Sequence, residues 1–241
     1  REGNAKYGRV GFAEASKRFT PEQIGRMDGQ RALITGSNQG IGFEAAQWMA
    51  ELGAAVHLVC RNVQRADEAK VAILAKMPHA QVEVHQLDVG ELERVRAFAA
   101  EFQAKYASLD VLVNNAGATK RGDFLELTEE DWSDGFALKF YSAVRCSRAA
   151  WVHLQASHGS IINIIGIGGR TGNAEFAIGG SVNAALMNLT KVLADRGVRD
   201  GVRVNAINPG SIATERLQVR IKKLAEEQNL NEAQAATRLA Q

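Results

Sequence analysis

Short apolar runs alternate along the chain with segments whose apolar residues recur at helical spacing. Arg31–Thr35 is such a run, and it is followed by a segment in which Ile41, Ala45, Trp48 and Leu52 fall on one helix face. The other runs that predict strands are Ala55–Val59, Val82–Leu87, Val111–Asn114, Ile161–Ile165 and Val202–Ile207. The other segments that predict helices are Ala66–Met77, Leu92–Tyr106, Trp132–Leu154, Gly180–Asp195 and Arg216–Gln241. Repeated strand–helix units predict an α/β fold with a doubly wound parallel sheet.

The pattern indicates a single domain that is preceded by an arm. Residues 1–28 lack a clear period and are predicted to form an N-terminal arm, whereas residues 29–241 carry the alternating elements. The last segment is predicted to be an amphipathic helix whose apolar face consists of Leu217, Ile221, Leu224 and Leu230.

Composition and charge narrow the class of protein. Hydrophobic residues make up 46% and charged residues 23% of the chain, and the formal net charge is +2. These values fit a soluble globular protein and favour neither a nucleic acid nor a membrane as partner. Cys60 and Cys146 are isolated, which is typical of a cytoplasmic protein without disulfides. The five histidines show no metal-ligand spacing, so we expect them to be structural or surface residues and expect no metal; they are His57, His79, His85, His153 and His158.

A glycine-rich segment lies between the first predicted strand and the first predicted helix. A tight turn at this place needs residues without a Cβ, and the helix that follows offers unpaired N–H groups and a positive dipole end to a phosphate. This context predicts a dinucleotide-binding loop in a sheet of Rossmann type. The alternative is a glycine-rich turn without a ligand. The residues concerned are Gly36, Ser37, Asn38, Gln39, Gly40, Ile41 and Gly42.

Four ordered motifs point to one family. TGSNQGIG at residues 35–42, LDV at 87–89, NNAG at 114–117 and NPG at 208–210 together resemble the signatures of short-chain dehydrogenases/reductases, over about residues 29–215. The resemblance implies a small-molecule carbonyl or alcohol substrate and a homodimer or homotetramer. The family's usual seventh strand is expected to be absent. The further cofactor contacts that it implies are Asp88, Val89, Asn115, Ala116, Gly117, Pro209, Gly210, Ile212 and Thr214.

The end of the second predicted strand bears on the choice of cofactor. An acidic residue there would bind the ribose hydroxyls of NAD and repel a 2′-phosphate. This chain has Cys60 at that position, followed by Arg61 and Asn62. Arg61 can hold a phosphate as a planar bidentate donor, so the sequence favours NADP(H) over NAD(H). The alternative is that Arg61 is an ordinary solvated loop charge.

The resemblance breaks at the family's catalytic positions. An alignment without gaps places Gly166 at the serine, Gly179 at the tyrosine and Asn183 at the lysine, and it places Lys139 at the asparagine of the preceding long helix. Glycine has no side chain with which to transfer a proton. Lys139 and Asn183 are therefore the candidate catalytic residues, with Lys139 as a substitute acid or base; the alternative is that Lys139 only fills space and hydrogen-bonds Asn183.

Three functions follow from these positions. The first is an NADP(H)-dependent oxidoreductase with a non-standard proton relay. The second is an NADP-binding pseudoenzyme that acts as a sensor, scaffold or partner subunit, and the third is a non-redox enzyme. The glycines of the segment from Gly166 to Gly180 suggest a roomy or mobile wall beside the site, or one whose constraint was lost together with catalysis.

Overall fold

The computed structural model describes residues 25–210 and 212–240. Its six-stranded sheet has the order β3-β2-β1-β4-β5-β6, and every pair of neighbouring strands is parallel. This confirms the predicted doubly wound α/β fold. The strands are β1 (Arg31–Thr35), β2 (Ala55–Cys60), β3 (Val82–Gln86), β4 (Val111–Asn114), β5 (Ser160–Ile164) and β6 (Arg203–Ile207).

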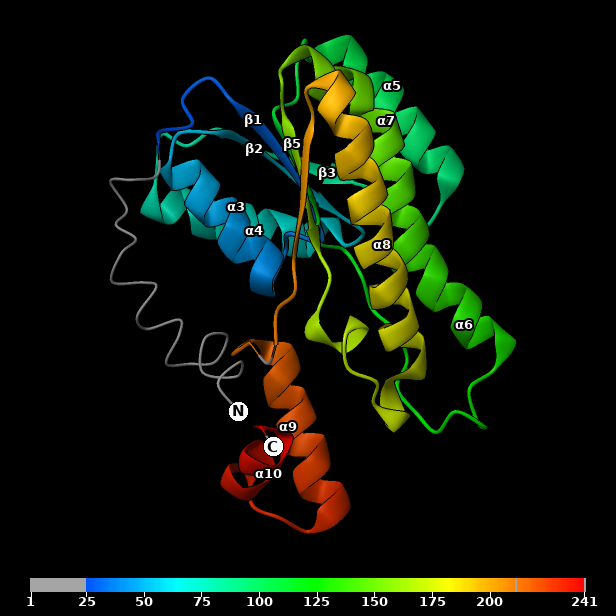
Figure 1. Ribbon diagram of the computed structural model, residues 1–241. Coiled ribbons are helices and arrows are strands. Elements are labelled where there is room, and N and C mark those ends of the chain that lie inside the picture. The colour runs from blue at the N-terminus through cyan, green and yellow to red at the C-terminus, as the bar shows by residue number, and fades with distance from the viewer. Residues whose placement is uncertain (1–24, 211, 241) are drawn as a thin grey trace.

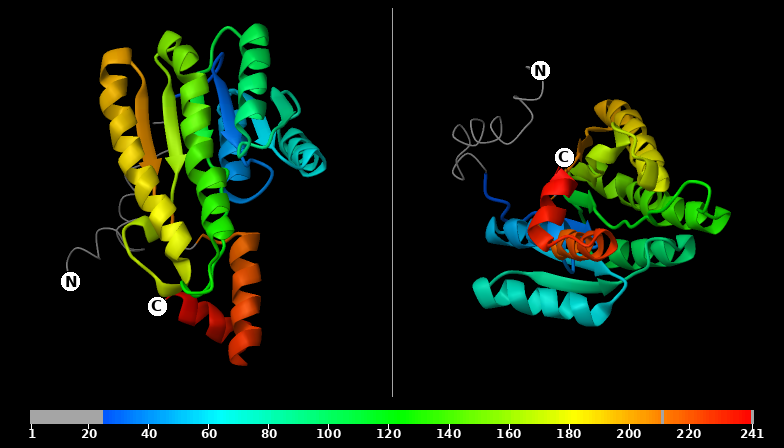
Figure 2. Two further views of the ribbon diagram at one scale, coloured as in Figure 1. Left: turned by 90° about the vertical axis from the view of Figure 1, so that its right-hand side faces the viewer. Right: turned by 90° about the horizontal axis from the view of Figure 1, so that it is seen from below.

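Helices cover both faces of the sheet, as Figures 1 and 2 show. On one face lie α3 (Gly40–Glu51) and α4 (Val63–Lys76), whose buried alanines and Ile73 pack against the strands. On the other face lie α5 (Leu92–Lys105) and α7 (Ser142–Ala156), with α8 (Ala177–Asp200) beside α7. Strand β1 serves both layers, because Leu33 packs with the α5–α7 layer whereas Ala32 and Ile34 pack with α3 and α4.

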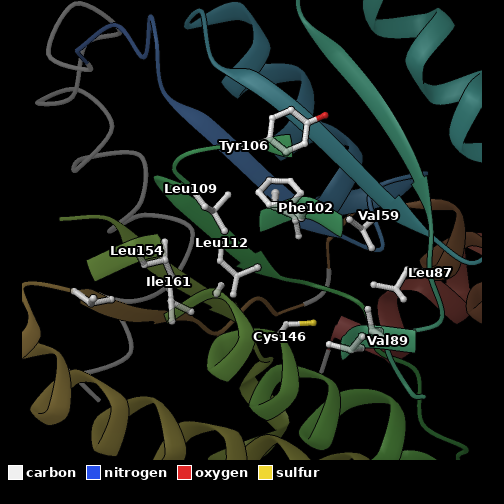
Figure 3. Packing of buried hydrophobic residues seen from close by; sticks show 14 of the residues in the cluster. Val59, Leu87, Val89, Phe102, Tyr106, Leu109, Leu112, Cys146, Leu154 and Ile161 are labelled. Carbon is white, nitrogen blue, oxygen red and sulfur yellow. The ribbon is translucent and has the colours of Figure 1, made fainter. Parts of the chain in front are cut away.

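The larger core cluster lies between the sheet and the α5–α7 layer. Figure 3 shows its side chains converging from α5, α7 and the strands, with Phe102 beside Tyr106 and the sulfur of Cys146 among aliphatic groups. Both cysteines are buried and free, and burial raises the pKa of Cys146 to about 12. Burial also raises the pKa of Cys60, so both thiols are held toward the protonated form, which is the poorer nucleophile.

Two predicted helices have a different form in the structure. The segment Trp132–Leu154, predicted to contain a long helix, is helical throughout, but α6 (Glu129–Gly135) and α7 are joined in it by the π-helix η2 (Phe136–Tyr141). The segment predicted as one helix over Arg216–Gln241 is a hairpin of α9 (Glu215–Gln228) and α10 (Glu232–Ala240). The chain turns at Asn229, which adopts the left-handed conformation with φ of 51° that often ends a helix.

The helical hairpin extends away from the sheet in Figures 1 and 2. Its small core pairs Ile221 and Ala225 of α9 with Ala235 of α10, and Leu217 and Leu224 pack against them. The predicted apolar face therefore exists for Leu217, Ile221 and Leu224, and it packs against α10, whereas Leu230 lies in the turn between the two helices and not on that face. The reason for this packing is that α10 follows α9 after a short turn, and its residues Ala235, Ala236 and Leu239 form a second apolar surface against which α9 packs.

The start of the described chain is anchored to the end of α3 and to the core beneath it. The backbone N–H of Met27 donates to the carbonyl of Leu52 at 2.8 Å, and the Met27 side chain packs on the α3–α4 core. Residues 1–24 of the predicted arm lie outside the described residues, so the predicted arm and domain boundary stay a prediction. None of the helices in the described part of the chain is long and apolar enough to cross a membrane.

Candidate functional site

The glycine-rich loop lies where the direction of strand order reverses. Strand β1 lies between β2 and β4, so the loop that follows β1 opens into the crevice at the carboxyl ends of these strands. Gly36 and Gly40 have φ of 66° and 59°, which side chains rarely adopt. A Cβ on Gly36 would also lie 2.9 Å from the Cα of Ala116. Glycine is thus required where the two loops meet.

Asn115 fastens the loop after β4 to the glycine-rich loop. Its side-chain amide donates to the carbonyls of Thr35 at 3.0 Å and Gly36 at 2.9 Å. In return, the Thr35 hydroxyl accepts the backbone N–H groups of Asn115 and Ala116, each at 3.0 Å. A Cβ on Gly42 would lie 2.4 Å from the Asn115 amide nitrogen. Asn115 therefore shapes the loop through hydrogen bonds to its backbone.

Other residues of the predicted cofactor set also face the protein with their side chains. The Ser37 hydroxyl is buried and donates to the carbonyl of Ile34 at 2.9 Å. The Val89 side chain belongs to the core, and one Asp88 oxygen accepts the N–H of Gly90 at 2.8 Å. Ser37 and Val89 can consequently meet a ligand only through their backbone.

The start of α3 is left open to an anion. Its N-cap residue, Gln39, makes no side-chain cap, and the first turn holds no acidic residue. The first N–H groups of the helix thus point into the crevice without a side-chain acceptor at the cap. Within the described residues, the side-chain oxygen of Asn208 is buried after β6 and has no hydrogen-bond partner. A helix start without a cap and a buried acceptor without a partner both fit a bound dinucleotide.

The predicted segment after β6 returns to this crevice. The Pro209 carbonyl accepts the N–H of Ile167 at 3.0 Å, which ties the segment to the loop after β5. A Cβ on Gly40 would lie 3.7 Å from the methyl group of Thr214, so Thr214 lies over the glycine-rich loop. Gly210 has open space around its Cα, and Ile212 is 46% exposed. Ser211 lies outside the described residues.

Two arginines lie at the carboxyl end of β2. Arg61 pairs with Asp88 through a contact of 3.7 Å, and 65% of its side chain is exposed. Arg65 donates to the side-chain oxygen of Gln39 in the glycine-rich loop at 3.5 Å. Asn62 caps α4 by accepting the N–H of Arg65 at 2.9 Å. The sequence analysis did not single out Arg65, although its place in the first turn of α4, four residues after Arg61, was an available signal.

The predicted pair of Lys139 and Asn183 is brought together. Lys139 lies on the π-helix η2, a distortion that often marks a functional position, and Asn183 is buried on α8. The Lys139 ammonium donates to the Asn183 side-chain oxygen at 2.6 Å and to the carbonyl of Ile165 at 2.5 Å. A Cβ on Gly117 would lie 2.8 Å from Cγ of Lys139, so that glycine makes room for the lysine.

The wall beside this pair is filled, which corrects the expectation of a roomy segment. The ring of Phe176 lies against α8, where a Cβ on Gly179 would be 2.0 Å from its Cζ. A Cβ on Gly168 would lie 2.9 Å from the same ring. Gly168 and Gly179 therefore leave the space that the Phe176 ring occupies, a contact that the sequence pattern did not predict. Short 3₁₀ turns, η3 (Ile167–Gly169) and η4 (Ala174–Phe176), shape the segment.

Arg121 lies on the outer side of Phe176. Its guanidinium carbon is 4.1 Å from the centre of the Phe176 ring, a cation–π contact. The N–H of Gly122 donates to the carbonyl of Glu175 at 3.2 Å, which joins the loop after β4 to the loop after β5. Burial lowers the pKa of Arg121, and the positive charge of Arg220 on α9 lowers it further. Arg121 and Arg220 therefore bring two positive charges to this side of the site, and the carboxylate of Glu175 partly compensates them.

An open parallel sheet with a glycine-rich loop at its switch point defines a dinucleotide-binding protein. Residues 30–225 match the profile of the short chain dehydrogenase family. The chain belongs to this family.

Individual relatives and solved structures agree with the family. The chain is 32% identical over 195 residues to 3-oxoacyl-[acyl-carrier-protein] reductase FabG of Chlamydia trachomatis, covering 79% of this chain and 77% of the relative. It is 30% identical over 190 residues to gluconate 5-dehydrogenase of Gluconobacter oxydans, covering 78% and 73%. The structure of L-sorbose reductase from Gluconobacter frateurii with NADPH and L-sorbose superposes with a TM-score of 0.79 at 33% identity, covering 83% and 76%.

Proposed function

We propose that the protein is an NADP(H)-dependent oxidoreductase that interconverts a small carbonyl compound and the corresponding alcohol. The observation that carries this proposal is the crevice after β1, where positive-φ glycines and the open start of α3 leave a cradle for a pyrophosphate. Relatives support the chemistry, since L-sorbose reductase was solved with NADPH and a gluconate 5-dehydrogenase of Burkholderia cenocepacia with NADP.

The arginines at the end of β2 support the phosphorylated cofactor. Cys60 occupies the place where a carboxylate would repel a 2′-phosphate, and it is buried against Ser37 with 3.6 Å between Sγ and Oγ. Arg61 and Arg65 approach the same end of the crevice from the strand end and from α4. A 2′-phosphate between them would accept charge-assisted hydrogen bonds from both guanidinium groups.

Lys139 is proposed as the source of the proton. When NADPH is bound, it supplies the hydride for reduction, and the resulting alkoxide oxygen needs one proton to become the alcohol. In the resemblance to the family, Gly166 and Gly179 stand at the serine and tyrosine positions and hold no proton. The Lys139 ammonium, which donates to Asn183, supports this proposal because it carries a proton that it can transfer.

The Lys139–Asn183 pair supports this role through its chemistry. By the same alignment, the family has asparagine at position 139 and lysine at position 183, so this chain holds the same two side-chain types in exchanged places. The exchange keeps one ammonium in contact with one amide, at 2.6 Å here. It moves the ammonium from α8 to the π-helix. The ammonium that the family carries at position 183 is thereby present on a different element, where we propose that it takes over the role of the missing acid.

Exchanging the two residues tests the pair. Asn183→Lys alone puts a second ammonium within contact of Lys139 in a buried place, and we expect a loss of stability of several kcal/mol. Adding Lys139→Asn should restore most of it, since one ammonium again meets one amide. Urea unfolding measures both effects. If the single variant Asn183→Lys is as stable as the double variant that also carries Lys139→Asn, the two side chains do not share a site and the proposed relay is wrong.

Binding and turnover test the function as a whole. Calorimetry with NADPH and NADH, combined with cofactor oxidation against a panel of ketoses, 3-oxo esters and simple ketones, should show tighter binding of NADPH and measurable turnover. Lys139→Met should keep NADPH binding and lose turnover by about 10²–10⁴-fold, the usual contribution of a general acid. Failure to bind either cofactor would overturn the proposal.

A cofactor-binding protein without rapid turnover is the second candidate. The observation that favours it is the Phe176 ring, which covers Gly179 with carbon where the family places its acid. NADPH binding without oxidation of any carbonyl compound, in wild type and in Lys139→Met alike, would support this candidate. A sensor, scaffold or partner subunit, or a non-redox enzyme, would behave in this way.

Self-association is a further part of the proposal. Valines on α7 and α8 are strongly exposed, with Val152 at 69%, Val192 at 55% and Val198 at 83%. Exposed apolar side chains on neighbouring helices favour a contact between copies of the chain. A homodimer or homotetramer should therefore appear in light scattering, and Val192→Lys with Val198→Lys should shift it toward the monomer.

A further inference from the structure

Two of the five histidines lie together with a carboxylate on the sheet, remote in sequence from the glycine-rich loop. His57 is on β2, and Glu83 and His85 are on β3. Parallel register places His57 directly opposite Glu83, and His85 follows Glu83 by two residues, so all three point to the same face. Sequence spacing alone could not show this grouping, because residue 57 and residue 83 meet only through strand pairing.

The three side chains offer ligand atoms close to one another. Nδ1 of His57 lies 2.9 Å from Nε2 of His85, and one ligand atom from each of the three residues lies within 4.8 Å of the others. The ligands of one tetrahedral zinc ion are separated by roughly 3.3–3.5 Å, given metal–ligand bonds of about 2.0–2.2 Å. The 2.9 Å contact between the two imidazoles is that of a hydrogen bond, so an ion would replace this bond as the side chains rotate to bind it.

We propose that His57, Glu83 and His85 form a binding site for a divalent transition metal of the zinc class. Two imidazole nitrogens and one carboxylate oxygen suit zinc, and they disfavour magnesium and calcium, which prefer oxygen ligands alone. Three protein ligands leave one coordination position for water. This revises the expectation from the sequence that the chain holds no metal, and it is independent of the proposed oxidoreductase function.

The surroundings of the site fit a ligand set that is held in place. The Tyr106 hydroxyl donates to Glu83 at 2.5 Å, which orients the carboxylate. Phe102 and Tyr106 of the α5 end enclose His57 edge-on, with ring centroids at 5.0 and 4.7 Å, and Figure 3 shows these two rings side by side over the sheet. His57 is fully buried, whereas 45% of the Glu83 side chain is exposed and gives an ion a path from solvent.

Three features of the site act against a metal ion. The Lys105 ammonium lies 2.8 Å from Glu83 and already compensates the carboxylate. The Arg31 guanidinium lies over the Tyr106 ring at 4.5 Å and adds positive charge nearby. Nε2 of His57 has no hydrogen-bond partner among the described residues, so it would carry its proton against the aromatic rings when Nδ1 binds the ion. Only metals with high affinity for imidazole should therefore bind.

The competition from Lys105 gives the site a distinctive property. The Lys105 side chain is 63% exposed, so it can leave Glu83 for water when an ion arrives. Replacing it with a neutral residue removes the competing charge from the carboxylate. Lys105→Met should thus bind zinc more tightly than the wild type. Such a gain is not expected from adventitious binding by surface histidines.

The test is to remove bound metal from the full chain with a chelator and then to titrate the chain with zinc, using calorimetry to measure binding. Wild type should bind one Zn²⁺, and His85→Gln and Glu83→Gln should each weaken binding at least 10-fold. Lys105→Met should strengthen it several-fold. The matched control is His79→Gln, an exposed histidine outside the cluster, which should bind as wild type does.

A second measurement reports the ligand geometry without relying on stability. Cobalt added in place of zinc should give the visible absorption bands of a four-coordinate site in wild type and in Lys105→Met, but not in His85→Gln. Absence of zinc binding in the wild type would overturn the proposal. Equal binding by wild type, His85→Gln and Lys105→Met would also overturn it, because the ion would then lie elsewhere.

Discussion

The contact between Phe176 and Gly179 makes a prediction in which one substitution changes sign. Alanine in place of glycine inside a helix ordinarily stabilises by about 1 kcal/mol. At Gly179 the new Cβ would lie 2.0 Å from Cζ of Phe176, whereas carbon atoms in contact are ordinarily about 3.5–4.0 Å apart. The ring must therefore move by roughly 1 Å or more, and forcing an extra carbon into a packed place in this way costs about 1–3 kcal/mol. Gly179→Ala should therefore destabilise the wild type by up to about 2 kcal/mol.

In a Phe176→Ala background the same substitution should be favourable. Without the ring, the alanine at position 179 meets no obstacle, so it gives the helix the usual stabilisation of up to about 1 kcal/mol over glycine. Urea unfolding of the four proteins measures the coupling energy, which should be about 1–3 kcal/mol. Gly180→Ala is the matched control, since its Cβ would meet only the Gly168 carbonyl, at 3.2 Å. Effects of Gly179→Ala and Phe176→Ala that add within about 0.5 kcal/mol would refute the reasoning.

Three further predictions concern the crevice and the helix layer. Arg65→Gln should weaken NADPH binding about 10-fold or more and leave NADH binding unchanged, because a charge-assisted hydrogen bond to the 2′-phosphate contributes about 1.5–3 kcal/mol. Calorimetry with both cofactors measures this. An equal loss of affinity for both cofactors would contradict the prediction. Asn115→Ala removes two hydrogen bonds to the glycine-rich loop, so thermal unfolding should show a loss of about 1–3 kcal/mol. The Trp151 indole and the Arg196 guanidinium hold the pKa of Asp200 below its usual range, so this carboxylate stabilises the fold above about pH 4 and the contribution is lost as pH falls through the lowered pKa. Asp200→Asn should flatten the acid limb of the stability profile, and an unchanged limb would exclude this role.

The fold could be predicted because its signals are local. Each strand is a continuous apolar run, as burial on both faces requires, and the strands β1 and β4 have the predicted bounds. The glycine-rich loop was predictable for the same reason, since the sequence from Thr35 to Gly42 specifies both the turn and the helix start. Where local signals conflicted with tertiary packing, the prediction was wrong: the hairpin of α9 and α10 arose because Asn229 ends a helix that the apolar spacing alone would continue.

Side-chain partners across the fold were not predictable in the same way. Asn115 was expected to contact the cofactor, and the structure shows its amide on the carbonyls of Thr35 and Gly36. Nothing in the sequence near Gly179 indicates that the Phe176 ring occupies the space beside this glycine, since the position of the ring depends on the turn at η4. His57 and Glu83 meet only through the register of β2 and β3. Sequence spacing carries no information on such pairs unless the strand order is already known.

The Lys139–Asn183 contact shows how the two kinds of information combine. In the resemblance to the family, residues 139 and 183 are each expected to be a different residue, and each difference taken alone suggests lost function. The structure places the Lys139 ammonium 2.6 Å from the Asn183 side-chain oxygen, so the two side chains share one site. An ammonium on the π-helix needs the space that Gly117 provides and the carbonyl of Ile165 as a second acceptor. These contacts are what the proposed proton source needs, and a lysine that only fills space and hydrogen-bonds Asn183 would make them too, so the turnover of Lys139→Met decides between the two roles.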